Sequence, residues 1–228
     1  MSFEENQNDE VINAVPEDSN TEKLDENDIL ALAKIEALTT PTFQECSSLL
    51  PAKTTANRLQ FGLHGGSSVY FNKEGSDTRF CVPGGKIGTI YLAENPLTAM
   101  KEVLQNTLSM TESDLDNYIM ADVMTLKDLK IVQSSALLAQ TSIKLHDLTT
   151  SSRSVTQKLA EKAHAAGMDG IEFVSNVTAQ TCYAIWHNDP SGDGIATTAS
   201  QTPLSRLTIN GEEAADVLVY KLKIPVEE

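Results

Sequence analysis

The stretch that decides the fold reads TRFCVPGGKIGTIYLAENPLTAMKEVLQNT and runs from residue 78 to residue 107. Its apolar run over residues 88–93 is rich in β-branched and aromatic side chains, which predicts a buried strand. Asn95 then supplies a helix N-cap and Pro96 a first helical residue. Apolar residues follow at helical spacing. The sequence therefore predicts a strand, a cap and a helix in direct succession.

Two residues inside this unit, Tyr91 and Glu102, have no obvious structural duty. Glu102 lies on or close to the apolar stripe of the predicted helix. An unpaired buried charge costs several kcal/mol, so such a carboxylate must reach water or be held where a charge is used. At this point both interpretations stay open: an exposed helical glutamate beside Lys101, or a functional carboxylate.

The charge of the chain is concentrated at one end. The chain has 228 residues, of which 40% are hydrophobic, enough for one domain of ordinary size with tails. Its net charge is −15, and residues 1–30 alone hold ten carboxylates against one lysine. Binding to nucleic acid needs clustered Lys and Arg to neutralise phosphates, so the composition argues against a nucleic-acid partner.

The cysteines and histidines suggest no metal site. Cys46, Cys81 and Cys182 form no CxxC pair, and the four histidines form no HExxH pair. An odd cysteine count argues against a disulfide framework and for a reducing compartment. We find neither a signal-peptide pattern nor an apolar run of membrane-spanning length. The expected protein is cytoplasmic and has no membrane partner.

Three regions are expected along the chain. Residues 1–22 are acidic and poor in large apolar groups, which predicts a disordered acidic arm. Residues 23–57 should hold an amphipathic helix over 24–38, which Asp25 or Asn27 could cap, followed by a linking loop. Residues 58–228 should form a catalytic domain that ends in a strand extension. The predicted helix either docks on its own domain or binds a partner, and both alternatives stay open.

The remaining pattern predicts more strands than helices, without strict alternation, and this favours an α+β fold. A helix that Ser154 or Thr156 could cap is expected to run to about Ala166, closed by Gly167. A mobile loop is expected over 188–203. The predicted strands cover residues 58–63 and 68–71 as a hairpin, 88–93, 118–124, 129–132, 171–174 and 182–186 as a pair, 206–209, and 217–224 after a turn at Asn210-Gly211.

Four residues can be read together: Arg79, Tyr91, Glu102 and Ser175. The run RF…GTIYLAENPLTAMKEV, followed by GMDGIEFVS…CYAIW, resembles the RES domain, a family named for its arginine, glutamate and serine. The resemblance covers about residues 58–186. It places the family's arginine on Arg79, its tyrosine on Tyr91, its glutamate on Glu102 and its serine on Ser175.

The resemblance implies an ADP-ribosyltransferase-like β core with flanking helices and an enzyme that attacks NAD+. Members of the family are known as toxins that break the nicotinamide glycosidic bond, with inorganic phosphate or water as acceptor. The chain would then be an NAD+ phosphorylase or glycohydrolase, with NAD+ as substrate and no further cofactor. Two alternatives stay open: transfer of ADP-ribose to a protein, and a catalytically inactive module that binds a nucleotide or a protein.

The family resemblance also implies a neutralising partner. RES toxins often pair with an Xre-type antitoxin, so an antitoxin or immunity protein is expected here as well. The acidic arm and the helix over 24–38 lie outside the resemblance, and we expect this extension to serve targeting, delivery or inhibitor contact. A homodimer is also left open.

The chemistry of NAD+ cleavage gives Glu102 and Arg79 distinct roles. Breaking the bond between ribose and pyridinium passes through an oxocarbenium-like state, which a carboxylate such as Glu102 stabilises. The diphosphate needs a cation of fixed geometry, and the guanidinium of Arg79 supplies it. Arg58 or Lys86 could assist in binding the diphosphate.

Tyr91 and Ser175 have supporting roles in this reading. The ring of Tyr91 can stack on nicotinamide while its hydroxyl reaches a ribose or phosphate oxygen. Ser175 is expected to position the substrate by hydrogen bonding, because no histidine is placed to activate it as a nucleophile.

Overall fold

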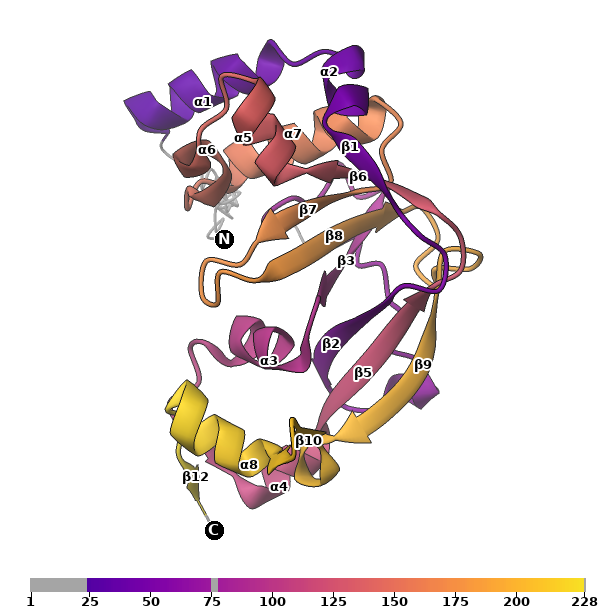
Figure 1. The fold of residues 1–228 in the computed structure, drawn as a ribbon, viewed down its shortest axis with the longest axis vertical. Helices are drawn as coiled ribbons and strands as arrows, with labels where there is room; N and C mark the ends of the chain where they lie inside the picture. Colours follow the sequence, from indigo (N-terminus) through magenta and orange to yellow (C-terminus); the bar gives the residue numbers. More distant parts are fainter. Residues whose placement is uncertain (1–23, 75–77, 228) are drawn as a thin grey trace, which may run out of the picture.

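The computed structural model describes residues 24–74 and 78–227, which form an α+β fold around one eight-stranded sheet (Figure 1). Its strand order is β1-β6-β7-β8-β3-β2-β5-β9, and neighbours pair antiparallel except for the parallel pair β6–β7. The predicted fold class is thereby confirmed. The strands are β1 (Ser47–Leu50), β2 (Thr55–Phe61), β3 (Gly88–Ala93), β5 (Tyr118–Thr125), β6 (Leu129–Gln133), β7 (Gly170–Val174), β8 (Thr181–His187) and β9 (Ala196–Pro203).

The predicted strand, cap and helix are confirmed. The strand is β3, and helix α3 (Pro96–Leu104) follows it after two residues. The side chain of Asn95 accepts a hydrogen bond of 2.9 Å from the backbone N–H of Thr98, so Asn95 caps the helix. A rigid N-cap and Pro96 at the first position fix the direction in which α3 leaves the sheet.

The sheet divides between β3 and β2. Strand β3 pairs with β8 along its whole length, and β2 pairs with β5 along its whole length. Between β2 and β3 themselves, the ladder contains one residue pair, Asn57 and Ala93. The two strands therefore diverge from that pair, and the sheet opens between its two halves.

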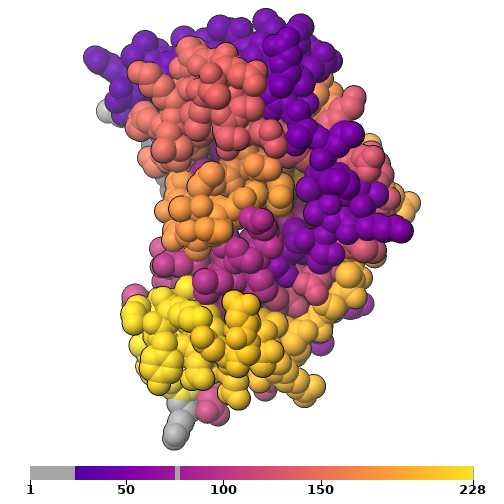
Figure 2. All heavy atoms as spheres, viewed as in Figure 1, coloured from indigo at the N-terminus to yellow at the C-terminus, as the bar shows by residue number. Residues whose placement is uncertain are grey.

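Figure 1 shows helices at both ends of the molecule. One group of helices lies at the sheet half that contains β6 and β7, and a second group, which includes α3, lies at the other half. Figure 2 shows the C-terminal residues, in yellow, at the end opposite to the indigo N-terminal helices. The first group comprises α1 (Glu26–Glu36), α2 (Thr40–Glu45), α5 (Ser134–Gln140), α6 (Leu145–Thr149) and α7 (Arg153–Ala165), and the second adds α4 (Glu112–Asn117) and α8 (Ala214–Asp216).

The core has two clusters on opposite faces of the sheet. Tyr91 belongs to the larger cluster and its neighbour Ile90 to the smaller one, as the alternation of side chains along a strand requires. Helices cover the larger cluster. The smaller cluster is covered by the segment around Val69 and Phe71, both of which are buried.

Helix α1 is capped by Asp25 as predicted, and it docks on its own domain. The side chain of Asp25 accepts 2.8 Å from the N–H of Asp28. The helix packs against α7 and buries Ala31 and Ile35. Two apolar residues of this helix, Ile29 and Leu30, are nevertheless 57% and 59% exposed.

Two predictions for the first third of the chain are wrong. The expected linking loop over 39–57 contains α2, the edge strand β1 and the start of β2, because Thr39 caps α2 and β1 finds a partner in β6. The expected return strand over 68–71 is absent from the described residues. In its place Asn72 makes an isolated bridge to Thr89, since β2 takes β5 as its partner.

Two predictions for the last third are also wrong. The expected loop over 188–203 contains β9, whose polar residues suit a strand with one exposed side beside β5. Residues 217–222 form a π-helix after α8, although an apolar run of this length fitted a strand equally well. The turn at Asn210-Gly211 is correct and joins β10 (Thr208–Ile209) to β11 (Glu212–Glu213).

The other expected elements fare unevenly. The predicted helix that Gly167 closes is α7, and β7 and β8 pair as expected. Helix α5 occupies a segment for which one helical turn near Leu137 and Leu138 was expected, whereas no helix was expected at α4 or α6. Strand β4 (Met110–Thr111) pairs with β12 (Val226–Glu227). The acidic arm over 1–22 lies outside the described residues. Within residues 24–74 and 78–227, no helix has both the length and the apolar character needed to cross a membrane.

The close approach of Phe71 to β3 gives a stability test. A Cβ atom added to Gly88 would lie 2.3 Å from the carbonyl oxygen of Phe71, a backbone atom that cannot easily move. We expect Gly88→Ala to lower the free energy of unfolding by about 3 kcal/mol in urea titration. Gly84→Ala is the matched control. Its added Cβ would meet open space at a φ of +95°, so it should cost only about 1 kcal/mol. Equal losses for the two variants would contradict this packing.

Candidate functional site

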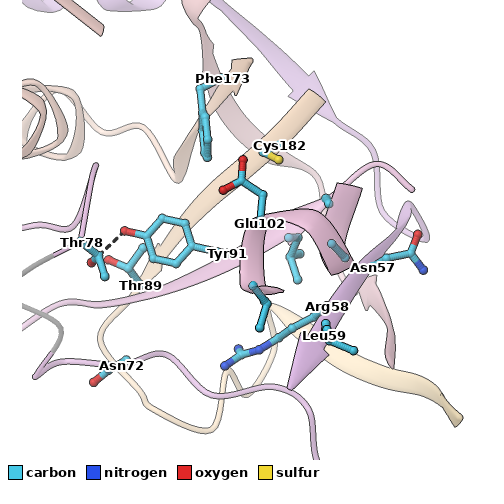
Figure 3. Close-up of a pocket in the computed structure, with 14 residues that line it drawn as sticks. Asn57, Arg58, Leu59, Asn72, Thr78, Thr89, Tyr91, Glu102, Phe173 and Cys182 are labelled. Carbon is cyan, nitrogen blue, oxygen red and sulfur yellow. Dashed lines mark hydrogen bonds between the residues drawn. The ribbon is translucent and has the colours of Figure 1, made fainter. Parts of the chain in front are cut away.

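A cleft lies where β2 and β3 diverge, closed on one side by α3 and on another by β7 and β8. It has two lobes, with volumes of about 320 and 390 Å³, and four residues line both of them: Thr78, Tyr91, Glu102 and Phe173. The first lobe extends along β2 and β3. The second extends toward the loop between α6 and α7. The two lobes therefore form one continuous site that meets at Tyr91 and Glu102. Figure 3 shows the residues that line the first lobe.

Glu102 projects from α3 into the junction of the lobes. Figure 3 shows its carboxylate pointing toward Phe173 and Cys182, with the ring of Tyr91 on the other side. The side chain is half-buried. Of the two interpretations of Glu102, the structure thus favours a carboxylate directed into a cleft.

Arg79 reaches the second lobe and is held on several sides. Its Nη2 donates a hydrogen bond of 3.0 Å to the carbonyl oxygen of Leu148. Its guanidinium carbon lies 5.1 Å from the ring centroid of Phe80 and 5.4 Å from that of Phe173, within the range of cation–π attraction. Burial lowers the pKa of Arg79, and the charge of Glu102 opposes that shift. The two residues that the sequence singled out thus line the same cleft.

The backbone at Phe80 explains how Arg79 points into the cleft. Phe80 has a φ of +58°, which is uncommon for a residue other than glycine. Its side chain is fully buried, and its carbonyl oxygen accepts 2.8 Å from Nε1 of Trp186. The strained conformation sends Phe80 into the core and leaves Arg79 at the cleft.

Tyr91 forms part of the wall, but its hydroxyl is already engaged. The hydroxyl lies 3.0 Å from Oγ1 of Thr78 and donates to the backbone carbonyl of Arg79. Burial raises the pKa of Tyr91 above its ordinary range. In this structure the Tyr91 hydroxyl is therefore not free for the expected contact with a ribose or phosphate oxygen. Its hydrogen bonds hold the segment that carries Arg79.

Ser175 shapes the turn between β7 and β8. Its Oγ accepts hydrogen bonds from the N–H groups of Val177 and Thr178, at 3.2 and 3.1 Å. Ser175 is buried and, among the described residues, is not one of those that line the two lobes. Its neighbours Asn176 and Val177 do line the second lobe. The serine thus stands behind the cleft wall.

The two assisting cations differ in position. Arg58 lines the first lobe from β2, and its Nη1 donates 3.2 Å to the carbonyl oxygen of Tyr70. Burial lowers the pKa of Arg58. Lys86 is exposed, and among the described residues it lines neither lobe. The structure brings Arg58 to the cleft and leaves Lys86 outside it.

Arg153 is a further cleft residue, and no sequence pattern predicted it. This arginine begins α7 and lines the second lobe together with Thr149, Thr150 and Ser151. Its charge lowers the pKa of Arg79, so the two guanidinium groups are close enough to interact. The available signal was an arginine after the run TTSS at a helix start. That signal does not place Arg153 beside Arg79, because the approach of the two residues depends on the tertiary fold.

Two buried polar atoms of the described residues lack a hydrogen-bond partner, and both belong to residues of the cleft. They are Nε of Arg79 and Oγ1 of Thr89. An unsatisfied buried donor costs free energy, and such groups are uncommon in native proteins. A ligand with acceptor oxygens would satisfy the guanidinium. In residues 24–74 and 78–227, no cluster of His, Cys, Asp or Glu is suited to hold a metal ion.

Comparison with known proteins places this geometry in a family context. A family model described as the RES domain matches residues 59–207. One chain in a crystal structure of the M. tuberculosis MbcT-MbcA toxin-antitoxin complex shares the fold with a TM-score of 0.54 and 15% sequence identity. The match covers 79% of this chain and 93% of that one. No curated protein matches the chain.

The buried thiol of Cys182 gives a pH test of the cleft wall. Burial raises the pKa of Cys182 to about 12, and the charge of Glu102 adds to the effect. The folded protein thus holds this proton more tightly than the unfolded chain does. The resulting stability is present below pH 9 and is lost as the pH rises toward 12. We expect the free energy of unfolding to fall more steeply above pH 9 for the wild type than for Cys182→Ala, by up to about 1.4 kcal/mol per pH unit.

Urea titrations of both proteins at pH 8, 9 and 10 measure the two slopes. A constant offset between the proteins reflects only the cavity that the substitution leaves. If the free energy of unfolding changes with pH at the same slope in both proteins, the thiol is not shielded from water in the cleft wall.

Proposed function

Because this chain belongs to the RES domain family, we propose that it is an enzyme that cleaves the bond between nicotinamide and ribose in NAD+. The observation that carries the proposal is the convergence of Arg79 and Glu102 on one cleft from separate parts of the chain. The buried and unpartnered Nε of Arg79 supports it, because a phosphate oxygen is an acceptor that such a donor lacks.

The charges of the cleft suit the two ends of this substrate. Arg79 and Arg153 give the second lobe a cationic wall, which matches the diphosphate. Glu102 lies at the junction of the lobes, where the nicotinamide ribose would follow the diphosphate. The first lobe is mainly apolar, with Leu59 and Leu92 among its walls, and this suits the pyridine ring.

The reaction breaks the C–N glycosidic bond and forms a C–O bond at the same ribose carbon. Nicotinamide leaves as a neutral molecule with the electron pair of the broken bond, so no acid needs to protonate it. The ribose carbon gains positive charge in the transition state, and the carboxylate of Glu102 stabilises that charge. The acceptor oxygen comes from water, which releases a proton, or from inorganic phosphate.

Tyr91 and Ser175 support the catalytic pair through the backbone. The Tyr91 hydroxyl fixes the carbonyl of Arg79, and Ser175 fixes the turn that carries Asn176 into the second lobe. Such positioning matters because a small displacement of a binding group costs a large factor in rate. The ring of Tyr91 remains available to stack on the substrate.

We further propose that the chain is a toxin that depletes cytoplasmic NAD+ and is neutralised by a partner protein. The shared fold with a chain of a toxin-antitoxin complex supports this role. An antitoxin of the Xre type is the partner that the RES family suggests. A partner that covers the cleft would stop substrate entry without changing the catalytic residues.

The central test is NAD+ consumption by the purified protein. We expect nicotinamide release by the wild type without any protein acceptor, and a loss of about 100-fold or more in kcat for Glu102→Gln. Glu112→Gln is the matched control, since Glu112 is an exposed carboxylate at the start of α4. Circular dichroism confirms that both variants are folded.

The same assay identifies the molecule that accepts the ADP-ribose group. Turnover that requires added inorganic phosphate identifies a phosphorylase, and turnover in its absence identifies a glycohydrolase. Nicotinamide release only in the presence of a protein that becomes ADP-ribosylated would favour transfer instead. Intact NAD+ after long incubation with micromolar folded protein would refute the proposed activity and favour a binding module.

Arg153 should contribute to binding of the diphosphate. A guanidinium that pairs with a phosphate contributes about 1–3 kcal/mol, so we expect Arg153→Ala to raise KM for NAD+ by roughly 5- to 150-fold. Arg206→Ala is the control, because Arg206 is exposed and, within the described part of the chain, lines neither lobe. Equal KM values for the two variants would remove Arg153 from the site.

A further inference from the structure

Helix α1 lies outside the matched region 59–207 but contacts the wall of the cleft. The Nζ of Lys34 donates to both carboxylate oxygens of Asp147, at 3.0 and 2.8 Å. The hydroxyl of Thr150 donates 3.0 Å to Oδ1 of Asp28. Two side chains of α1 therefore bind the segment over residues 147–150, which comprises the end of α6 and the first residue after it.

That segment also holds the guanidinium of the site. The carbonyl oxygen of Leu148 accepts the hydrogen bond from Arg79, one residue after Asp147. Thr150 itself lines the second lobe. A continuous path of contacts thus runs from Lys34 through Asp147 and Leu148 to Arg79.

The burial of these groups shows that the segment depends on α1. Asp147 is only 3% exposed, and its carboxylate also accepts 2.8 Å from the backbone N–H of Lys144. Lys34 supplies the cation that pairs with this buried charge, at 2.8 Å. A buried carboxylate that loses its cation is strongly disfavoured, so the segment would shift to expose it to water.

Other contacts dock α1 without touching this segment. Glu36 forms ion pairs with Lys158 at 2.9 Å and with Lys162 at 3.1 Å, both on α7. These pairs are partly exposed and join α1 to a regular helix. Neighbouring residues of α1 thus make separable contributions: Glu36 fixes the helix to α7, whereas Lys34, together with Asp28, reaches the cleft wall.

We propose that α1 braces the substrate site and that Lys34 is a positioning residue, which acts through Asp147 and the Leu148 carbonyl on Arg79. The inference rests on the proposed cleavage of NAD+ and assigns part of the extension to the site itself. In this proposal α1 supports substrate binding rather than targeting or delivery. Since Arg79 binds the diphosphate, loss of the brace should weaken substrate binding more than it slows the chemical step.

The test compares three variants of the full chain. We expect Lys34→Met to raise KM for NAD+ by about tenfold or more with a smaller change in kcat. Lys34→Arg keeps the cation and should restore KM to within about threefold of the wild type. Lys162→Met removes a cation that joins α1 to α7 and should leave KM near the wild-type value. Equal KM values for Lys34→Met and Lys162→Met would overturn the brace.

Amide hydrogen exchange gives a second readout that does not require activity. We expect the amides of residues 147–151 to exchange faster in Lys34→Met than in Lys162→Met, whereas the amides of β5 serve as a reference for intact folding. Equal exchange at 147–151 would overturn the brace whatever the kinetics show. If the wild type fails to consume NAD+, the proposed function fails, and the exchange data alone decide whether α1 holds this segment.

Discussion

The site depends on the way two neighbouring strands part. β2 and β3 share the single pair Asn57–Ala93 and then follow different partners, β5 and β8. A sheet that stayed paired at this point would bring its strands about 4.8 Å apart and leave no room for a ligand. The divergence creates a cleft with strand walls on two sides, and α3 then directs Glu102 into it.

The guanidinium of Arg79 is held by its surroundings without any ligand. Arg79 lies against two aromatic rings, with one hydrogen bond to the Leu148 carbonyl and its own carbonyl fixed by Tyr91. These contacts come from the neighbouring Phe80 and from residues of β7, α6 and β3. Preorganisation of this kind lowers the free energy needed to orient a binding group when the substrate enters. The same packing leaves Nε of Arg79 without a partner inside the protein.

Local signals predicted the parts of the fold that local chemistry determines. Asn95 and Pro96 mark the start of α3 correctly because capping involves only neighbouring residues. The failures involve pairing over long distances. The sequence of β1 did not predict a strand, because this strand depends on its pairing with β6. Residues 217–222 fold as a helix although their apolar pattern fits a strand. Arg153 was missed for the same reason, since its distance from Arg79 depends on the tertiary fold.

The most direct measurement is a crystal structure of the Glu102→Gln protein with NAD+ bound, because this variant should retain the substrate without cleaving it. The account predicts the diphosphate against Arg79 in the second lobe, with the nicotinamide ribose beside residue 102. Ordered NAD+ at another surface, with this cleft unoccupied at saturating concentration, would contradict it.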